Sequence, residues 1–234
     1  MIIISSVSKK FGKLQVLDNI SLTCNKGECI GLIGPNASGK TTLIKTILGM
    51  VVQDSGFITF NGNNILHDWK YREQIGYMPQ TGRYPDNMSI GHLLDMISDI
   101  RGTNIKRDME LIESFGLKSI MHKRMRTLSG GTRQKVSAAL AFLFSPAVLI
   151  LDEPTAGLDP VSSEILKEKI VSEKQMGRLI LITSHILSEL DELVTQVIYM
   201  EEGKVHFHKN IDQLFKDTGE ERLNKAIAHY MRIR

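Results

Sequence analysis

The stretch "GPNASGKTT", residues 34–42, has the composition of a loop that binds phosphate. It fits the pattern G-x-x-x-x-G-K-[ST] and lies between an apolar run, "CIGLIG", and an amphipathic run, "LIKTILGM". Gly34 and Gly39 allow the backbone to curl so that successive N–H groups point at phosphate oxygens. Lys40 can then reach the outer phosphates, and the Thr41 hydroxyl can bind Mg²⁺. An ordinary glycine-rich turn is disfavoured, because the flanking runs predict the strand and helix that this pattern requires.

Two adjacent carboxylates, Asp152 and Glu153, end another apolar run in "AVLILDEPTAGLD". At the tip of a strand, Asp152 can bind Mg²⁺ directly or through water, and Glu153 can polarise an attacking water. A helix cap or a surface ion pair is the alternative. It does not explain why both carboxylates follow five apolar residues at the site-forming end of a strand.

Three further features are weak alone. "LSGGT", residues 128–132, places Ser129 and two glycines at a helix start, where free N–H groups can bind an anion. Gln80 follows the strand-like "IGYMP" and could reach the metal or the water, and His185 follows "LILITS". Each of them could instead be an ordinary structural residue. Their order along the chain is the stronger signal.

Length and composition indicate a soluble globular protein with one sizeable α/β core, or a core with a small subdomain. The 234 residues are 42% hydrophobic and 24% charged, with a net charge of +3 that is too small to indicate nucleic-acid binding. The N-terminus resembles a strand and not a signal peptide. The longest apolar run, residues 138–151, is interrupted by Pro146 and falls short of the ~20 residues that a membrane-spanning helix needs. We therefore expect a cytoplasmic protein that reaches a membrane only through a partner.

Strands alternating with helices predict an α/β fold with a mainly parallel sheet and ligands at the carboxyl ends of its strands. Apolar residues at helical spacing over residues 89–127 predict a helical insertion. We also expect a helix over residues 186–193 and a helical tail over residues 217–234, with residues 1–216 as the nucleotide-binding domain. Expected strands cover residues 2–7, 21–24, 28–33, 57–60 and 75–79.

The cysteines and two histidines have unremarkable interpretations. Cys24 and Cys29 flank "NKGE", which resembles a hairpin turn, so they could bind a soft metal or form a bridge. Two small apolar residues in paired core strands are the simpler interpretation. His206 and His208 share one face of an expected strand, where solvated or partly packed histidines are commoner than metal ligands.

The ordered set "GPNASGKTT", "YMPQ", "LSGGT", "LILDEPTAGLD" and "ITSH" resembles the ATP-binding subunit of an ABC transporter over nearly the whole chain. The resemblance implies a P-loop NTPase fold with an antiparallel β subdomain, Mg²⁺-dependent ATP hydrolysis and an adenine-stacking aromatic, Phe11. Glu153, His185 and Gln80 are then catalytic. The metal ligands are Thr41, Gln80 and Asp152. The implied nucleotide-binding residues are Phe11, Gly34, Pro35, Asn36, Ala37, Ser38, Gly39, Lys40, Thr41, Thr42, Ser129, Gly130 and Gly131.

Two residues depart from the family pattern. Ala37 stands where glycine is frequent, and Thr132 replaces the usual glutamine of the signature "LSGGT". Neither change removes a catalytic group, so we expect an active enzyme. The resemblance further implies that the signature closes over the ATP of a second, antiparallel copy, as a two-fold interface allows. A transmembrane permease subunit is the implied partner, at the cytoplasmic face of the inner membrane.

A finer resemblance involves "YMPQTGRYPDNMSI", "ILITSHILSELDEL" and "GKVHFHK". These stretches are similar to the ATPase of the ABC transporter that helps mature nitrous-oxide reductase, a copper enzyme. This would add a periplasmic maturation protein as a partner. Tyr84 and Met88 lie in the first stretch, where contact with the membrane partner and packing within the insertion are both open interpretations.

The main rival is a soluble ABC-type ATPase that acts on ribosomes or DNA. DNA-repair relatives need a long coiled-coil insertion, and the stretch between Lys40 and Leu128 is too short for one. Ribosome-acting relatives usually carry two such domains in one chain. A small-molecule kinase would not explain the signature or His185. A module that only binds ATP is possible in principle, but Glu153 and His185 are both present.

Overall fold

The computed structural model describes residues 1–102 and 106–232, and a six-stranded sheet lies at its centre. The strand order is β10-β9-β3-β8-β7-β6, with every neighbouring pair parallel except β10 and β9. The expectation of a mainly parallel core sheet is therefore confirmed. Its strands are β3 (Cys29–Ile33), β6 (Ile75–Met78), β7 (Val148–Asp152), β8 (Leu179–Thr183), β9 (Gln196–Glu201) and β10 (Lys204–Asn210).

A second, antiparallel sheet with the order β2-β1-β4-β5 forms the expected β subdomain. In β1, the side chains of Ile2, Ile4 and Val7 are buried, as expected for a strand with one face on the core. The four strands are β1 (Ile2–Phe11), β2 (Leu14–Cys24), β4 (Ser55–Phe60) and β5 (Asn63–Asn64).

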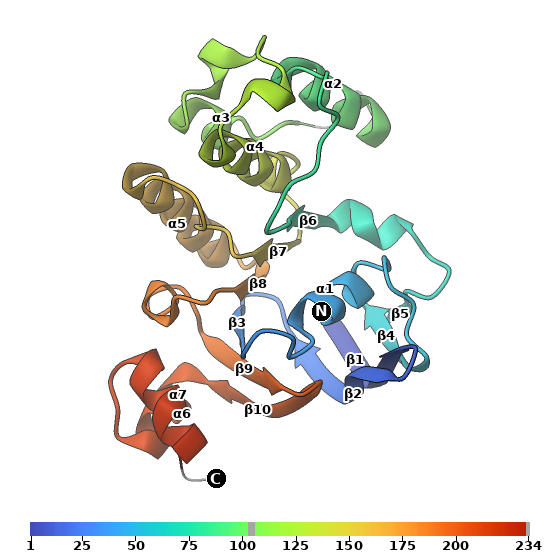
Figure 1. The fold of residues 1–234 in the computed structure, drawn as a ribbon, viewed down its shortest axis with the longest axis vertical. Helices are drawn as coiled ribbons and strands as arrows, with labels where there is room; N and C mark the ends of the chain where they lie inside the picture. Colours follow the sequence, from blue (N-terminus) through green and yellow to red (C-terminus); the bar gives the residue numbers. More distant parts are fainter. Residues whose placement is uncertain (103–105, 233–234) are drawn as a thin grey trace.

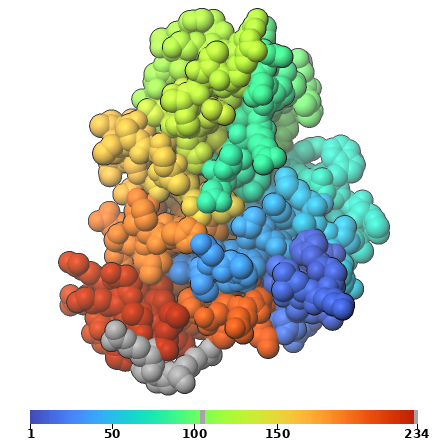
Figure 2. Space-filling view, viewed as in Figure 1, coloured from blue at the N-terminus to red at the C-terminus, as the bar shows by residue number. Residues whose placement is uncertain are grey.

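The helices form layers on the core sheet and one projecting region. Figure 1 shows α2, α3 and α4 at one end of the molecule and α6 and α7 at the other, and Figure 2 shows the projecting end as a distinct lobe. Short 3₁₀ turns cover Lys70–Gln74, Leu117–Ile120, Met125–Thr127 and Leu187–Glu189. The helices are α1 (Lys40–Ile47), α2 (Ile90–Arg101), α3 (Glu110–Ser114), α4 (Gly130–Phe142), α5 (Pro160–Gln175), α6 (Ile211–Thr218) and α7 (Leu223–Arg232).

The predicted insertion, residues 89–127, contains α2, α3 and two 3₁₀ turns, although its residues 103–105 lie outside the described part of the chain. Residues 233–234 of the predicted tail lie outside it as well. The boundary between a domain over residues 1–216 and a tail stays a prediction. Within residues 1–102 and 106–232, no helix is both long enough and apolar enough to cross a membrane.

Two hydrophobic cores cover the two faces of the central sheet. Leu149 and Leu151 of β7 belong to one core with α4 and α5, whereas Ile150 belongs to the other core with α1 and the antiparallel sheet. All five residues of β7 are buried. A strand covered on both faces needs apolar residues at consecutive positions, which explains the unbroken run "VLIL".

The strand β6 and the helix α4 touch through their backbones. A Cβ atom added to Gly76 of β6 would lie 2.0 Å from the carbonyl oxygen of Ala141 in α4. No side chain fits into that space, so glycine is required for this approach of strand and helix.

The predicted helix over residues 186–193 is wrong, since only Leu187–Glu189 forms a 3₁₀ turn there. The apolar spacing that suggested a helix arises because Leu190 and Leu193 are buried. Tertiary contacts set the conformation instead: Glu189 accepts a hydrogen bond from the Thr155 hydroxyl (2.5 Å), and Asp191 accepts one from the N–H of Leu223 (2.8 Å).

The predicted hairpin between Cys24 and Cys29 is also wrong, because β2 and β3 belong to different sheets. The polar turn between them carries the chain from one sheet to the other. Both cysteines are free and buried, and burial raises the pKa of each thiol to about 12. The described residues contain no group of three or more His, Cys, Asp or Glu side chains arranged to hold a metal ion.

A buried lysine joins α5 to the region around α3. The side chain of Lys169 is 3% exposed, and its Nζ lies 2.7 Å from Asp108, 2.6 Å from Glu110 and 3.1 Å from Glu173. Burial disfavours the charge of Lys169, but hydrogen bonds to the three carboxylates outweigh this effect and raise its pKa. The cluster fixes the projecting region to the core.

We expect Lys169→Met to lower the free energy of unfolding by about 3 kcal/mol, because it leaves the buried Glu173 carboxylate without its main partner. Lys167→Met is the matched control, since Lys167 is more exposed and lies 4.0 Å from Glu164. Its effect should stay below about 1 kcal/mol. Urea denaturation measures both, and equal losses in the two variants would contradict a special role for the buried cluster.

Candidate functional site

The register of the central sheet brings the predicted site residues to one edge. Leu32 of β3 pairs with Thr183 of β8, and Thr183 pairs with Asp152 of β7. Since these strands are parallel, the segments that follow them leave the sheet side by side. They enclose a cavity of about 270 Å³. Its lining consists of Leu14, Val16, Asn36, Ala37, Ser38, Gly39, Lys40, Thr41, Thr42, Gln80, Asp152, Glu153 and His185.

The phosphate loop, residues 34–42, depends on two glycines with positive φ. A Cβ at Gly34 (φ 152°) would lie 1.9 Å from the carbonyl oxygen of Met200, and one at Gly39 (φ 101°) would lie 2.6 Å from that of Val16. Ala37 has φ 63° and therefore keeps a left-handed conformation with a Cβ present, at a cost of about 1–2 kcal/mol. The loop therefore tolerates alanine at position 37, where the family pattern frequently has glycine.

Lys40 lies across the inside of this loop. Its Nζ donates hydrogen bonds to the carbonyl oxygens of Gly34 (2.7 Å) and Pro35 (2.9 Å). Burial lowers the pKa of Lys40, although the carboxylates of Glu153 and Asp152 act in the opposite direction. The ammonium group is thus held at the centre of the loop by carbonyl groups.

The carboxylate pair is held by Thr183, the last residue of β8, and by His185, which lies just beyond that strand. The Glu153 carboxylate lies 2.8 Å from Nε2 of His185, and Asp152 accepts a hydrogen bond from the Thr183 hydroxyl at 2.5 Å. Glu153 has φ 51°, an uncommon conformation for a residue other than glycine that is typical of functional sites. Asp152 is 5% exposed and Thr183 is 1% exposed.

Sequence reasoning missed Thr183. The available signal was a hydroxyl residue at the end of the apolar run "LILIT", at the same edge of the sheet as Asp152. Sequence patterns assign strand ends, but they do not say which side chain on one strand reaches which carboxylate on the next.

The signature residues and Phe11 do not line this cavity. Ser129 caps α4: its Oγ accepts a hydrogen bond from the N–H of Thr132 (3.2 Å) and lies 2.8 Å from the Thr132 hydroxyl. Ser129 and Gly130 are exposed. Phe11 ends β1 and is 50% exposed, with Lys9 Nζ 5.5 Å from its ring centre. One copy of the chain therefore presents the signature and the phosphate loop on separate surfaces.

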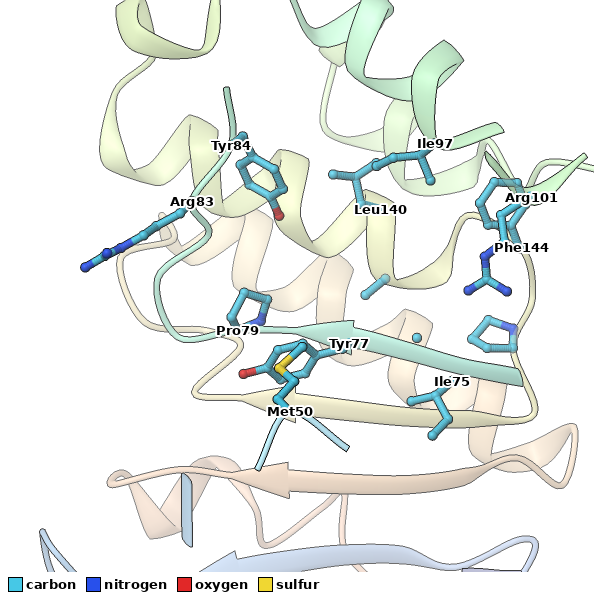
Figure 3. Close-up of a pocket in the computed structure, with 13 residues that line it drawn as sticks. Met50, Ile75, Tyr77, Pro79, Arg83, Tyr84, Ile97, Arg101, Leu140 and Phe144 are labelled. Carbon is cyan, nitrogen blue, oxygen red and sulfur yellow. The ribbon is translucent and has the colours of Figure 1, made fainter. Parts of the chain in front are cut away.

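A second hollow, a groove of about 370 Å³, lies between β6 and the helices α2 and α4 (Figure 3). Ile75 and Tyr77 form its core side, and Ile97, Leu140 and Phe144 face them. Burial, and then the charge of Asp152, raise the pKa of Tyr77 to about 12. Pro79 lines this groove and the next residue, Gln80, lines the carboxylate cavity, so the two hollows are adjacent. Remaining lining residues are Met50, Gly76, Pro79, Arg83, Tyr84, Arg101, Ala141 and Pro146.

Two side chains fix the segment that follows Gln80. The Tyr84 hydroxyl lies 2.9 Å from the Ser137 hydroxyl of α4, and Met88 packs against the core. Tyr84 thus lines the groove and packs against α4 at the same time. In Figure 3, the Arg83 side chain points away from the groove.

Comparison with known proteins gives consistent results. Residues 17–156, more than half of the chain, match the family model described as ABC transporter. The lantibiotic transport ATP-binding protein SrtF of Streptococcus pyogenes is 33% identical over 225 residues, which cover 93% of this chain and 96% of that protein.

Solved structures agree with this assignment. One described as the ATP binding subunit of an ABC transporter has a TM-score of 0.89 and 26% identity, covering 97% of this chain and 98% of its own. A second structure, a dimeric ATP-binding cassette in a post-hydrolysis state bound to ADP and Pi, has a TM-score of 0.81 at 20% identity. The match covers 90% of this chain and 99% of the other, and it shows a shared fold. The chain belongs to the ABC transporter family, in which it is an ATP-binding subunit that hydrolyses ATP.

Proposed function

We propose that two copies of this chain hydrolyse Mg-ATP to drive a transmembrane permease. The observation that carries the proposal is the single cavity in which Lys40, Gln80, Asp152, Glu153 and His185 meet. The phosphate loop binds the triphosphate through its N–H groups and Lys40. Phe11, exposed at the end of β1, offers its ring to adenine.

The donor set of the cavity fits Mg²⁺. A hydroxyl from Thr41, an amide oxygen from Gln80 and a carboxylate from Asp152 are hard oxygen ligands of the kind that Mg²⁺ takes together with phosphate oxygens. When bound, the ion neutralises charge that develops on the phosphates. These three residues would hold it, as proposed from the sequence.

Glu153 is the proposed general base. Its carboxylate accepts a proton from the attacking water, and His185, 2.8 Å away, holds that carboxylate and contacts the terminal phosphate. The two carboxylates thus have different roles: Asp152 would bind the metal, and Glu153 receives the proton. The left-handed backbone at Glu153 sets the direction of its side chain.

The second copy supplies Ser129, Gly130 and Gly131 to complete the site. In one copy these residues are at the exposed N-terminus of α4, outside the cavity, where N–H groups are free to bind phosphate. An antiparallel pair uses each surface twice and gives two composite sites. The solved cassette bound to ADP and Pi, which shares this fold, is described as dimeric and so supports a pair of copies.

The groove beside Gln80 is the proposed contact with the permease. It is lined mainly by apolar side chains, and Tyr84 connects it to α4 through Ser137. Pro79 lines the groove, and Gln80, a proposed metal ligand, directly follows it. A partner bound in the groove would therefore shift Gln80 through the peptide bond that joins the two residues. This assignment puts the chain at the cytoplasmic face of the inner membrane.

The transporter that we propose serves copper-site maturation of nitrous-oxide reductase, together with a periplasmic maturation protein. Support comes from three stretches that resemble the ATPase of that system: residues 77–90, 180–193 and 203–209. The relative SrtF is described as transporting a lantibiotic, so 33% identity is compatible with a different cargo. No observation favours the alternative, an ATPase that acts on ribosomes or DNA.

Lys40→Ala should weaken ATP binding about 100-fold, because it removes a charged hydrogen-bond donor from the phosphate site. Lys45→Ala is the matched control. It removes the same charge from the same helix, but at an exposed position. Titration with a fluorescent ATP analogue measures both affinities. Unchanged binding by Lys40→Ala would refute the assigned phosphate site.

Glu153→Gln should slow hydrolysis by about 10²- to 10⁴-fold while ATP binding persists, because the amide keeps the shape of the side chain but accepts no proton. The uncleaved nucleotide should then hold the two copies together. Size-exclusion chromatography should detect a dimer with Mg-ATP and a monomer with Mg-ADP.

Adding Ser129→Arg to the Glu153→Gln variant tests the composite site. The arginine side chain would fill the space of the partner's phosphate, so the dimer should be lost while the phosphate loop still binds ATP. A dimer that survives this change, or a Glu153→Gln variant that hydrolyses ATP at the parent rate, would contradict the proposed roles.

The copper role predicts which proteins accompany the chain in its native membrane. Mild-detergent purification of the tagged chain should recover a permease and a copper-handling maturation protein, identified by mass spectrometry. The Lys40→Ala chain is the control. It should recover the same proteins, because the groove proposed to contact the permease is intact in it. A permease without copper-handling proteins would refute the finer role alone, whereas ribosomes or DNA-repair factors would refute the transport role.

A further inference from the structure

The hydroxyl of Thr183 connects both members of the carboxylate pair. Thr183 Oγ1 lies 2.5 Å from Asp152 Oδ1, and the N–H of Glu153 lies 3.0 Å from the same Oγ1. The Glu153 N–H also reaches the carbonyl oxygen of Thr183, at 3.2 Å. With 1% of its surface exposed, Thr183 makes these contacts away from solvent.

The directions of these hydrogen bonds follow from the donor inventory. A backbone N–H only donates, so Thr183 Oγ1 must accept from Glu153. The single hydroxyl proton of Thr183 is therefore free for Asp152, whose ionised carboxylate only accepts. One oxygen atom of Asp152 is thus occupied by a neutral donor, and the residue lines the cavity.

We propose that Thr183 is a positioning residue for ATP hydrolysis. Its hydroxyl fixes the rotation of the Asp152 carboxylate, so that one oxygen is presented to the metal site. The hydroxyl oxygen and the carbonyl oxygen of Thr183 both accept from the N–H of Glu153. They keep Glu153 in its left-handed conformation, from which its side chain reaches His185. The inference rests on the proposed roles of Asp152 and Glu153.

The competing interpretation is that Thr183 is only a buried strand residue. β8 lies between β3 and β7, and a β-branched side chain suits that environment whether or not it carries a hydroxyl. Valine has nearly the same shape as threonine and retains the backbone carbonyl that binds Glu153. Thr183→Val therefore removes the hydroxyl and little else, and Thr183→Ser keeps it.

The experiment compares Thr183→Val, Thr183→Ser and Glu153→Gln with the parent chain. Thr183→Val should lower kcat about 10- to 100-fold, the usual effect of removing a group that orients a metal ligand. Thr183→Ser should recover most of that loss. Thr218→Val is the matched control. Thr218 is a buried threonine in α6, far along the chain from the site, and its hydroxyl donates a hydrogen bond to the carbonyl oxygen of Leu214. Its kcat should equal that of the parent.

Binding provides a readout that does not depend on turnover. A fluorescent ATP analogue is titrated with Mg²⁺ and again with EDTA. Thr183→Val should weaken the affinity for the Mg²⁺ complex and leave the affinity for the metal-free nucleotide unchanged, since the phosphate loop is intact. A purely structural role would weaken both affinities or neither.

The outcomes separate this inference from the proposed function. If Glu153→Gln is inactive while Thr183→Val retains the parent kcat, the positioning role is overturned and the proposed function stands. Equal losses in the Val and Ser variants would also overturn it, because they would assign the effect to packing. A fully active Glu153→Gln would overturn the roles of the carboxylates and this inference with them.

If Thr183→Val does not fold, Thr183→Ser and Thr183→Cys decide. These two variants have side chains of similar size, but a thiol is a much weaker hydrogen-bond donor than a hydroxyl. Activity in the serine variant and a large loss of kcat in the cysteine variant would support the inference. Equal activity in both would overturn it.

Discussion

The register of four parallel strands is the constraint on which the rest of the structure depends. β3, β8, β7 and β6 end at one edge, so the phosphate loop, His185, the carboxylate pair and Gln80 leave the sheet together. A shift of one residue in any strand would turn its side chains to the opposite face. The two hydrophobic cores prevent such a shift, because each face of the sheet already carries its own set of buried residues.

Sequence alone predicted the parts of the site that lie in loops with a distinctive composition. The phosphate loop and the carboxylate pair follow apolar runs, and both the strand and its chemistry are visible locally. Thr183 was missed because its role arises from pairing between β7 and β8, which are distant in sequence. The helix over residues 186–193 was wrongly predicted for a related reason: Glu189 and Asp191 bind groups on other elements, and these contacts override the local periodicity.

Two residues of the site have a left-handed backbone conformation. Ala37 and Glu153 both have positive φ, at about 1–2 kcal/mol each, and both line the site cavity. Positive φ is not confined to the site, since Ser6, Asn19, Asn61, His67, Ser145 and Glu202 also have it. The fold tolerates this cost because β3 and β7 are fully buried and fix the chain before each strained residue.

The contact between β6 and α4 at Gly76 has a consequence for the genetics of the chain. Every missense change at a glycine codon adds at least a Cβ, and here even that first carbon would lie 2.0 Å from the Ala141 carbonyl oxygen. Residue 76 contacts no phosphate and carries no chemistry. Missense variants there would nevertheless resemble active-site lesions, since they would displace the strand that leads to Gln80.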